Sequence, residues 1–108
     1  MQLDELRRLC AAGEYIVSQH ALIRCAQRDI DLDDVRRVIM EGEVIEDYPD
    51  DPRSPSCLMM AILGYPLHVV AGIRDECAWV ITTYVPTLDK WESDYKTRRV
   101  NNNDLHQV

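Results

Sequence analysis

Apolar residues recur at helical spacing near the start of the chain and at strand spacing after residue 43. The first group consists of Leu3, Leu6, Leu9 and Cys10. Their spacing predicts a helix with one apolar face. Gly13 follows as a natural helix stop. The chain therefore opens with a short amphipathic helix.

Two further helices are predicted, each with its own N-terminal signal. Ser18 is a good N-cap for a helix that runs to about Arg28. Asp31 caps a third helix, which is followed by Gly42. Its inward-facing residues are Val35, Val38 and Ile39.

The pattern after residue 43 predicts four β-strands separated by loops and tight turns. The expected strands cover 43–48, 57–63, 67–73 and 77–85. Pro86 ends the last strand because it cannot donate a hydrogen bond to a ladder. Thr87 is then expected to cap a last helix, and oppositely charged residues four apart support that helix. Residues 101–108 are predicted to form a disordered tail.

These elements predict one α+β domain over residues 1–100, with N-terminal helices, a four-stranded antiparallel β-meander and a C-terminal helix. The sequence leaves open whether the side chains of His68 and Tyr84 lie on the same face of the sheet. If residues 74 and 77 pair directly, His68 and Tyr84 lie on opposite faces of the sheet, whereas a slip of one residue brings them to the same face.

Composition narrows the function classes. No apolar run approaches the roughly 20 residues of a membrane span, and the N-terminus lacks the pattern of a signal peptide, so we expect a cytoplasmic protein. The four cysteines are far apart and form no zinc-module spacing, so we expect free, packed thiols and predict no metal or cofactor. The net charge of −7 argues against strong binding of bare RNA.

Several blocks of the chain resemble one family over roughly residues 14 to 98. The blocks are Ser18-x-His20-Ala21-x-x-Arg24, Gly42-Glu-Val-Ile-Glu-Asp-Tyr-Pro-Asp-Asp51, Pro55-Ser-Cys57, Pro66-Leu-His-Val69, and Thr83-Tyr-x-Pro86 leading to Lys90-Trp-Glu-x-Asp-Tyr95. Together they are similar to the small bacterial family known as domain of unknown function 4258.

That resemblance implies a toxin-like protein of the RelE/ParE-like superfamily, a class of small α+β ribonucleases and gyrase poisons. It also implies a partner, since members are often encoded beside a zinc-finger protein of the antitoxin kind. The acidic charge departs from the basic ribonuclease toxins of this superfamily, so help from a ribosome or a partner is expected for RNA.

A metal-independent mRNA endonuclease needs proton transfer and a cation for the developing phosphorane. We expect His20, Arg24, His68 and Tyr84 to be the catalytic residues. Residues expected to bind substrate are Arg28, Trp91, Tyr95 and Arg98, by phosphate contacts or base stacking.

Other interpretations stay open for the same residues. His20 and Arg24 also fit a structural contact with acids, His68 a hydrogen-bonded histidine within the fold, and Trp91 and Tyr95 a helix packed on the sheet. The alternative function is a non-catalytic protein-binding module of the same fold. A metal-dependent hydrolase that uses His20 and His68 is the least favoured of the three.

Overall fold

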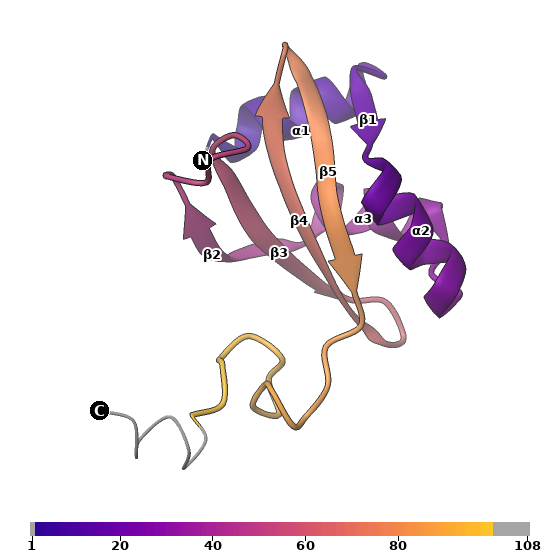
Figure 1. Ribbon diagram of the computed structural model, residues 1–108, viewed down its shortest axis with the longest axis vertical. Helices are drawn as coiled ribbons and strands as arrows, with labels where there is room; N and C mark the ends of the chain where they lie inside the picture. Colours follow the sequence, from indigo (N-terminus) through magenta and orange to yellow (C-terminus); the bar gives the residue numbers. More distant parts are fainter. Residues whose placement is uncertain (1, 101–108) are drawn as a thin grey trace.

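The computed structural model describes residues 2–100 and has an α+β architecture with three helices and a five-stranded mixed sheet (Figure 1). The helices are α1 (Leu3–Ala11), α2 (Gln19–Arg28) and α3 (Leu32–Glu41). The strands are β1 (Tyr15–Val17), β2 (Glu43–Tyr48), β3 (Ser56–Ile62), β4 (Pro66–Arg74) and β5 (Cys77–Tyr84). No helix in this part of the chain is long and apolar enough to cross a membrane.

The sheet order is β1-β5-β4-β3-β2, so the predicted antiparallel meander is present and gains one strand at its β5 edge. Strand β1 pairs parallel with β5 through Ile16 opposite Trp79. The expectation of four strands was incomplete because β1 has only three residues. Its partner strand lies more than sixty residues away, so no local sequence pattern predicts the pairing.

The helix signals act as predicted. Ser18 Oγ accepts a hydrogen bond from the amide of Ala21 at 3.0 Å, and Asp31 Oδ1 accepts one from the amide of Asp33 at 2.8 Å. Gly42 is the C-cap of α3, and the position requires glycine because a Cβ there would lie 2.5 Å from the carbonyl oxygen of Val38. Helices α2 and α3 are therefore each fixed by a side-chain cap as well as by an apolar face, whereas α1 has no side-chain cap.

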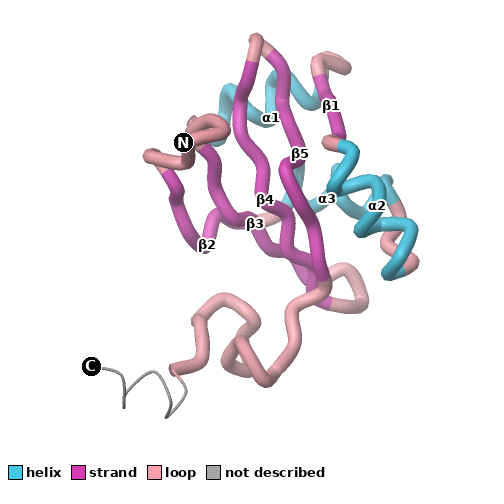
Figure 2. The backbone as a smooth tube through the Cα atoms, viewed as in Figure 1, coloured by secondary structure: helices cyan, strands magenta, loops and turns pink. Residues whose placement is uncertain are grey.

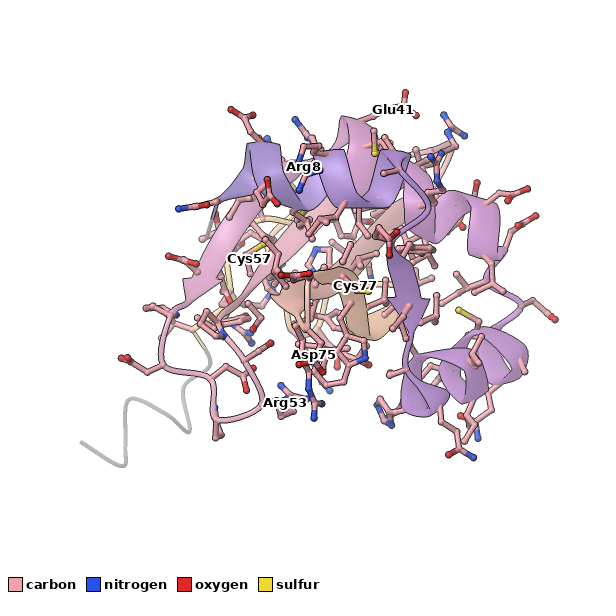
Figure 3. The ribbon with its side chains drawn as sticks, turned by 90° about the horizontal axis from the view of Figure 1, so that it is seen from above. Arg8, Glu41, Arg53, Cys57, Asp75 and Cys77 are labelled. Atoms are coloured by element: carbon pink, nitrogen blue, oxygen red, sulfur yellow. The ribbon has the colours of Figure 1, made fainter. Side chains whose placement is uncertain are left out.

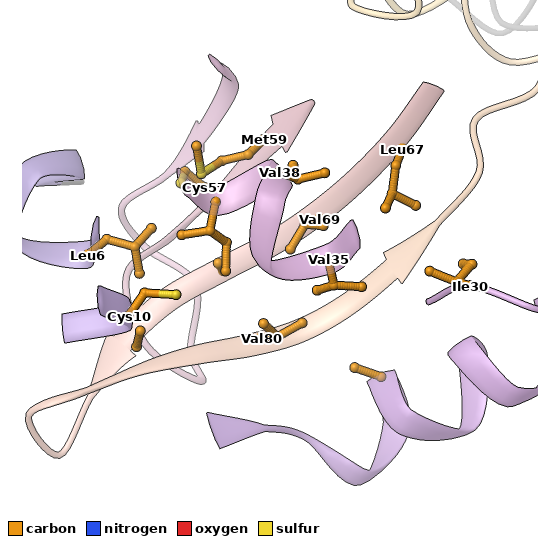
Figure 4. Packing of buried hydrophobic residues seen from close by; sticks show 14 of the residues in the cluster. Leu6, Cys10, Ile30, Val35, Val38, Cys57, Met59, Leu67, Val69 and Val80 are labelled. Carbon is orange, nitrogen blue, oxygen red and sulfur yellow. The ribbon is translucent and has the colours of Figure 1, made fainter. Parts of the chain in front are cut away.

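The main core lies between the helices and one face of the sheet. Figure 4 shows side chains from α1 and α3 meeting side chains from β3, β4 and β5, among them Leu6, Cys10, Val35, Val38, Met59, Val69 and Val80. All four cysteines are free thiols: Cys10, Cys25 and Cys57 are buried in this packing as predicted, whereas Cys77 is only half-buried.

Residues 86–100, which we call the C-terminal segment, pack on part of the opposite face of the sheet. Trp91 packs there against Leu58, Val70 and Ile81. Figure 2 shows this segment as loop rather than helix, so the predicted C-terminal helix was wrong.

Local hydrogen bonds explain why no helix forms there. Asp94 accepts hydrogen bonds from the amides of Lys96 and Thr97 at 2.9 and 3.0 Å, and Tyr95 has a φ of 58°. An aspartate that bonds the backbone two and three residues ahead favours a turn over a helix. The chain reverses at this turn, and Trp91 then pairs with Arg98 in an antiparallel bridge.

A β-bulge settles the open register. Arg74 pairs directly with Cys77 and Ala71 with Val80, but the register then shifts, so that Val70 pairs with Thr82. The extra residue is Ile81, and beyond it His68 pairs with Tyr84. Because directly paired residues share a face, the bulge brings these two side chains to the same side of the sheet.

Candidate functional site

A pocket of about 500 Å³ opens between α2 and the end of β5. We call it the α2–β5 pocket. It is lined by residues of α2, of β5 and of the first part of the C-terminal segment: Arg24, Arg28, Thr82, Thr83, Tyr84, Val85, Pro86, Thr87, Lys90 and Trp91. Figure 1 shows α2 running beside the end of β5 that is not paired with β1.

Ser18 fixes this arrangement. Its amide donates to the carbonyl of Val80 at 3.0 Å, and its hydroxyl donates to the carbonyl of Ile81 at 2.8 Å. Pairing between β1 and β5 ends at Val17 opposite Val80. Helix α2 therefore begins where β1 stops and lies along the part of β5 that leads into Tyr84.

One side of α2 carries two of the three cations of the pocket. Arg24 and Arg28 are four residues apart and so lie on the same side of the helix. His20 is one turn earlier on this side, but it is exposed and is not among the residues that line the pocket. Lys90 contributes a third cation from the C-terminal segment.

These three cations have no ion-pair partner in the part of the chain that the structure describes. No carboxylate of residues 2–100 lies within ion-pairing distance of Arg24, Arg28 or Lys90. The residues that line the pocket include no aspartate or glutamate. In a chain with a net charge of −7, this leaves a local site suited to an anion.

Most other arginines of the protein are already engaged, whereas Arg36 on α3 forms no ion pair within residues 2–100. Arg8 pairs with Glu5 on α1, and Arg53 pairs with Asp51 in the loop after β2. Figure 3 shows Arg8 on the helical side of the molecule and Arg53 on the opposite side. These two paired arginines, which lie outside the pocket, provide matched controls for the cations in it.

Tyr84 connects the pocket to His68, which is fully buried under the C-terminal segment. His68 Nδ1 lies 3.2 Å from Tyr84 Oη, and His68 Nε2 lies 2.6 Å from the main-chain oxygen of Tyr95. A carbonyl oxygen can only accept, so Nε2 carries the proton and Nδ1 accepts from the tyrosine hydroxyl. Trp91 packs edge-on against the imidazole, with 4.5 Å between ring centroids.

Burial sets the charge state of this pair. Loss of solvent lowers the pKa of His68, against the raising effects of the Tyr95 carbonyl and of Glu46. Burial also raises the pKa of Tyr84. Both groups are therefore neutral near pH 7, and the tyrosine hydroxyl is a hydrogen-bond donor with a proton acceptor behind it.

Arg98, also predicted to bind substrate, instead holds the C-terminal segment in place. Arg98 binds both carboxylate oxygens of Glu46 at 2.8 and 3.0 Å, and its guanidinium lies 4.7 Å from the centroid of the Trp91 ring. Burial would raise the pKa of Glu46, but hydrogen bonds from Arg98 and Tyr48 outweigh it and hold that pKa below its ordinary value.

The structure thus divides the candidate residues into two groups and leaves His20, which is exposed, outside both. Arg24, Arg28, Tyr84 and Trp91 line one pocket. His68, Tyr95 and Arg98 lie behind it or beside it, in contacts with other parts of the protein. His20 and His68 are not brought together, because α2 packs on the helical core whereas His68 lies on the face covered by the C-terminal segment.

Sequence reasoning missed four polar residues of the pocket: Thr82, Thr83, Thr87 and Lys90. The sequence predicted Thr87 as the cap of a last helix and gave Lys90 no role in a site. Only the loop conformation after Pro86 turns Lys90 toward α2. No group of three or more histidine, cysteine, aspartate or glutamate side chains that could hold a metal ion occurs within residues 2–100.

Comparison with known proteins gives one match. The family model described as "Domain of unknown function (DUF4258)" matches residues 17–85, well over half of the chain. This range includes α2, α3 and strands β2 to β5, and with them the bulge and most of the pocket. No curated protein and no solved structure matches the chain.

Proposed function

The chain belongs to the DUF4258 family, and on that premise we propose that it is a toxin-like protein that binds single-stranded RNA in the α2–β5 pocket and cleaves it without a metal. The observation that carries this proposal is the set of three unpaired cations, Arg24, Arg28 and Lys90, around one pocket of an acidic protein. Guanidinium groups bind phosphate oxygens in a bidentate fork, and a lysine adds a point charge, so these cations suit a phosphodiester.

The proposed reaction is attack by a ribose 2′-oxygen on the adjacent phosphorus. Tyr84 takes the proton of the 2′-hydroxyl while its own proton passes to Nδ1 of His68, which becomes an imidazolium held by the Tyr95 carbonyl. The 5′-oxygen leaves with a proton from solvent water, because His20, one turn before Arg24, does not line the pocket. The products are a 2′,3′-cyclic phosphate and a 5′-hydroxyl, and the cations stabilise the phosphorane between them.

In this scheme His68 acts through Tyr84 and does not touch the substrate. Support comes from the hydrogen bond between the two side chains and from the position of Tyr84 in the lining of the pocket. The proposed RelE/ParE-like relationship rests on the family resemblance and on the order of elements, with helices before an antiparallel meander. A toxin of this kind needs a partner that holds its activity in check.

Induced expression in a bacterial host tests the proposal. Growth and total RNA are followed for the wild type, for Arg24→Ala/Arg28→Ala, and for the charge-matched control Arg8→Ala/Arg53→Ala. We expect arrest with fragmented mRNA for the wild type and the control, and normal growth for the pocket variant. Normal growth with intact RNA from soluble, folded wild-type protein would overturn the endonuclease.

The second candidate is a non-catalytic protein-binding module of the same fold. It is favoured by two observations: the net charge of −7, and the occupation of both ring nitrogens of His68 by groups of the protein itself. Intact RNA in the expression experiment would favour this candidate.

A further inference from the structure

We infer that the groove between α2 and the start of α3 is a docking site for a basic amphipathic helix of a partner protein. The groove has a volume of about 480 Å³ and is lined by Leu22, Cys25, Ala26, Asp29, Ile30, Asp31 and Leu32. Two of its leucines are solvent-exposed, Leu22 at 44% and Leu32 at 43%. Ile23, next to Leu22 on α2, is 48% exposed.

Exposed large apolar residues that gather on two consecutive elements mark an interaction site more strongly than single ones do. Elsewhere in the described chain, exposed residues such as Ile16 and Ile62 stand on separate strands. A groove between two helices with apolar residues about one turn apart fits the apolar face of a third helix.

The charge around the groove specifies the partner. Asp29 and Asp31 are part of its lining and Asp33 follows them, while none of the lining residues is a lysine or an arginine. Asp29, Asp31 and Asp33 form no ion pair with any cation of residues 2–100. Such an apolar floor with an acidic rim favours a helix that has leucine-like residues on one side and lysine or arginine beside them.

The same charges disfavour two other occupants. An anionic lipid surface would be repelled by the acidic rim and by the net charge of −7. In a symmetric dimer each subunit presents the same patch, so these aspartates would face their own copies. A basic segment of a different protein satisfies both the apolar and the charged part of the surface.

The groove is separate from the α2–β5 pocket. Leu22 and Ala26 are each two positions from Arg24 or Arg28, which places them on nearly opposite sides of α2. The inference therefore does not depend on the RNA proposal, and each can fail alone.

The test is an NMR titration of the ¹⁵N-labelled full chain with a synthetic helical peptide of leucine, alanine and lysine, with its leucines on one face. A matched peptide carries glutamate in place of every lysine. The variants are Leu22→Ser/Leu32→Ser and Asp29→Asn/Asp31→Asn. Asparagine keeps the N-cap at position 31 and tolerates the positive φ of residue 29.

We expect saturable binding of the lysine peptide, with shifted amides between residues 22 and 32, and no binding of the glutamate peptide. Affinity should fall about fivefold in the asparagine variant and about tenfold or more in the serine variant. Shifts that map elsewhere, or an affinity that neither variant changes, would overturn the inference. Concentration-dependent shifts of the same amides without peptide would also overturn it, because a second copy would then be the occupant.

Discussion

His68 on β4 and Tyr84 on β5 face each other across paired strands, with 3.2 Å between Nδ1 and Oη, because one extra residue in β5 shifts the register between them. Ile81 is that residue. Without it, Tyr84 would point to the helical side of the sheet. The bulge therefore places the hydroxyl of Tyr84 between the cationic pocket and a neutral buried imidazole.

Replacing His68 with alanine should destabilise the protein. The change leaves the Tyr84 hydroxyl and the Tyr95 carbonyl without their partner and opens a cavity beside Trp91. We expect the free energy of unfolding to fall by about 2–4 kcal/mol in urea denaturation. His20→Ala, at an exposed position, should change it by less than about 0.5 kcal/mol. Equal effects of the two substitutions would contradict the contacts assigned to His68.

Stability should also depend on pH through His68. Burial lowers the pKa of this histidine in the folded protein below its ordinary value of 6.5. Below that pH the unfolded chain binds a proton that the folded protein does not yet bind, so the free energy of unfolding falls as the pH falls. The slope can reach about 1.4 kcal/mol per pH unit.

Urea denaturation of the wild type and of His68→Gln between about pH 7 and pH 5 measures this dependence. The variant lacks the titrating group and should lose most of the slope in that window, although its stability is lower throughout. Glu46 does not contribute to the slope in this window, since its pKa is held below the ordinary carboxylate value. Parallel slopes for the two proteins would assign the pH dependence to another group.

Arg98 should act on the C-terminal segment rather than on RNA. Arg98→Ala removes the two hydrogen bonds to Glu46 and the contact with the Trp91 ring. Because the pair is partly exposed, we expect a loss of about 1 kcal/mol and faster hydrogen–deuterium exchange at residues 90–99. Glu46→Gln should produce a similar change in exchange. A loss of RNA affinity in Arg98→Ala as large as that in Arg24→Ala would instead make Arg98 a substrate contact.

Local signals in the sequence were enough to predict α1 to α3 and the four-strand meander. Caps such as Ser18 and Asp31, and the change of period after residue 43, act over a few neighbouring residues. The two errors involve interactions that no such pattern contains. Strand β1 depends on pairing with a strand far along the chain. The expected last helix does not form because Asp94 stabilises a turn in its place.

Four residues that line the pocket, Arg24, Arg28, Tyr84 and Trp91, are among the site residues predicted from the sequence. The spacing of Arg24 and Arg28 on α2 is visible in the sequence, and both line the pocket. The role of His68 was not, because its partners depend on a bulge and on a main-chain carbonyl in a loop. Lys90 was missed since its position follows from the path of the C-terminal segment after Pro86.

RNA binding by the purified protein tests the central claim most directly. Fluorescence anisotropy of a short labelled single-stranded RNA is measured between about 50 and 200 mM salt for the wild type, Arg24→Ala/Arg28→Ala, and the control Arg8→Ala/Arg53→Ala. The two variants lose the same charge, so only the place of the cations differs between them.

With three phosphate contacts, the logarithm of the wild-type association constant should fall with the logarithm of salt concentration with a slope of about −2. The control should match the wild type. The pocket variant should bind at least about tenfold more weakly, with a slope nearer −1. Equal affinity of the pocket variant and the wild type, or an equal loss in both variants, would contradict RNA binding in the α2–β5 pocket.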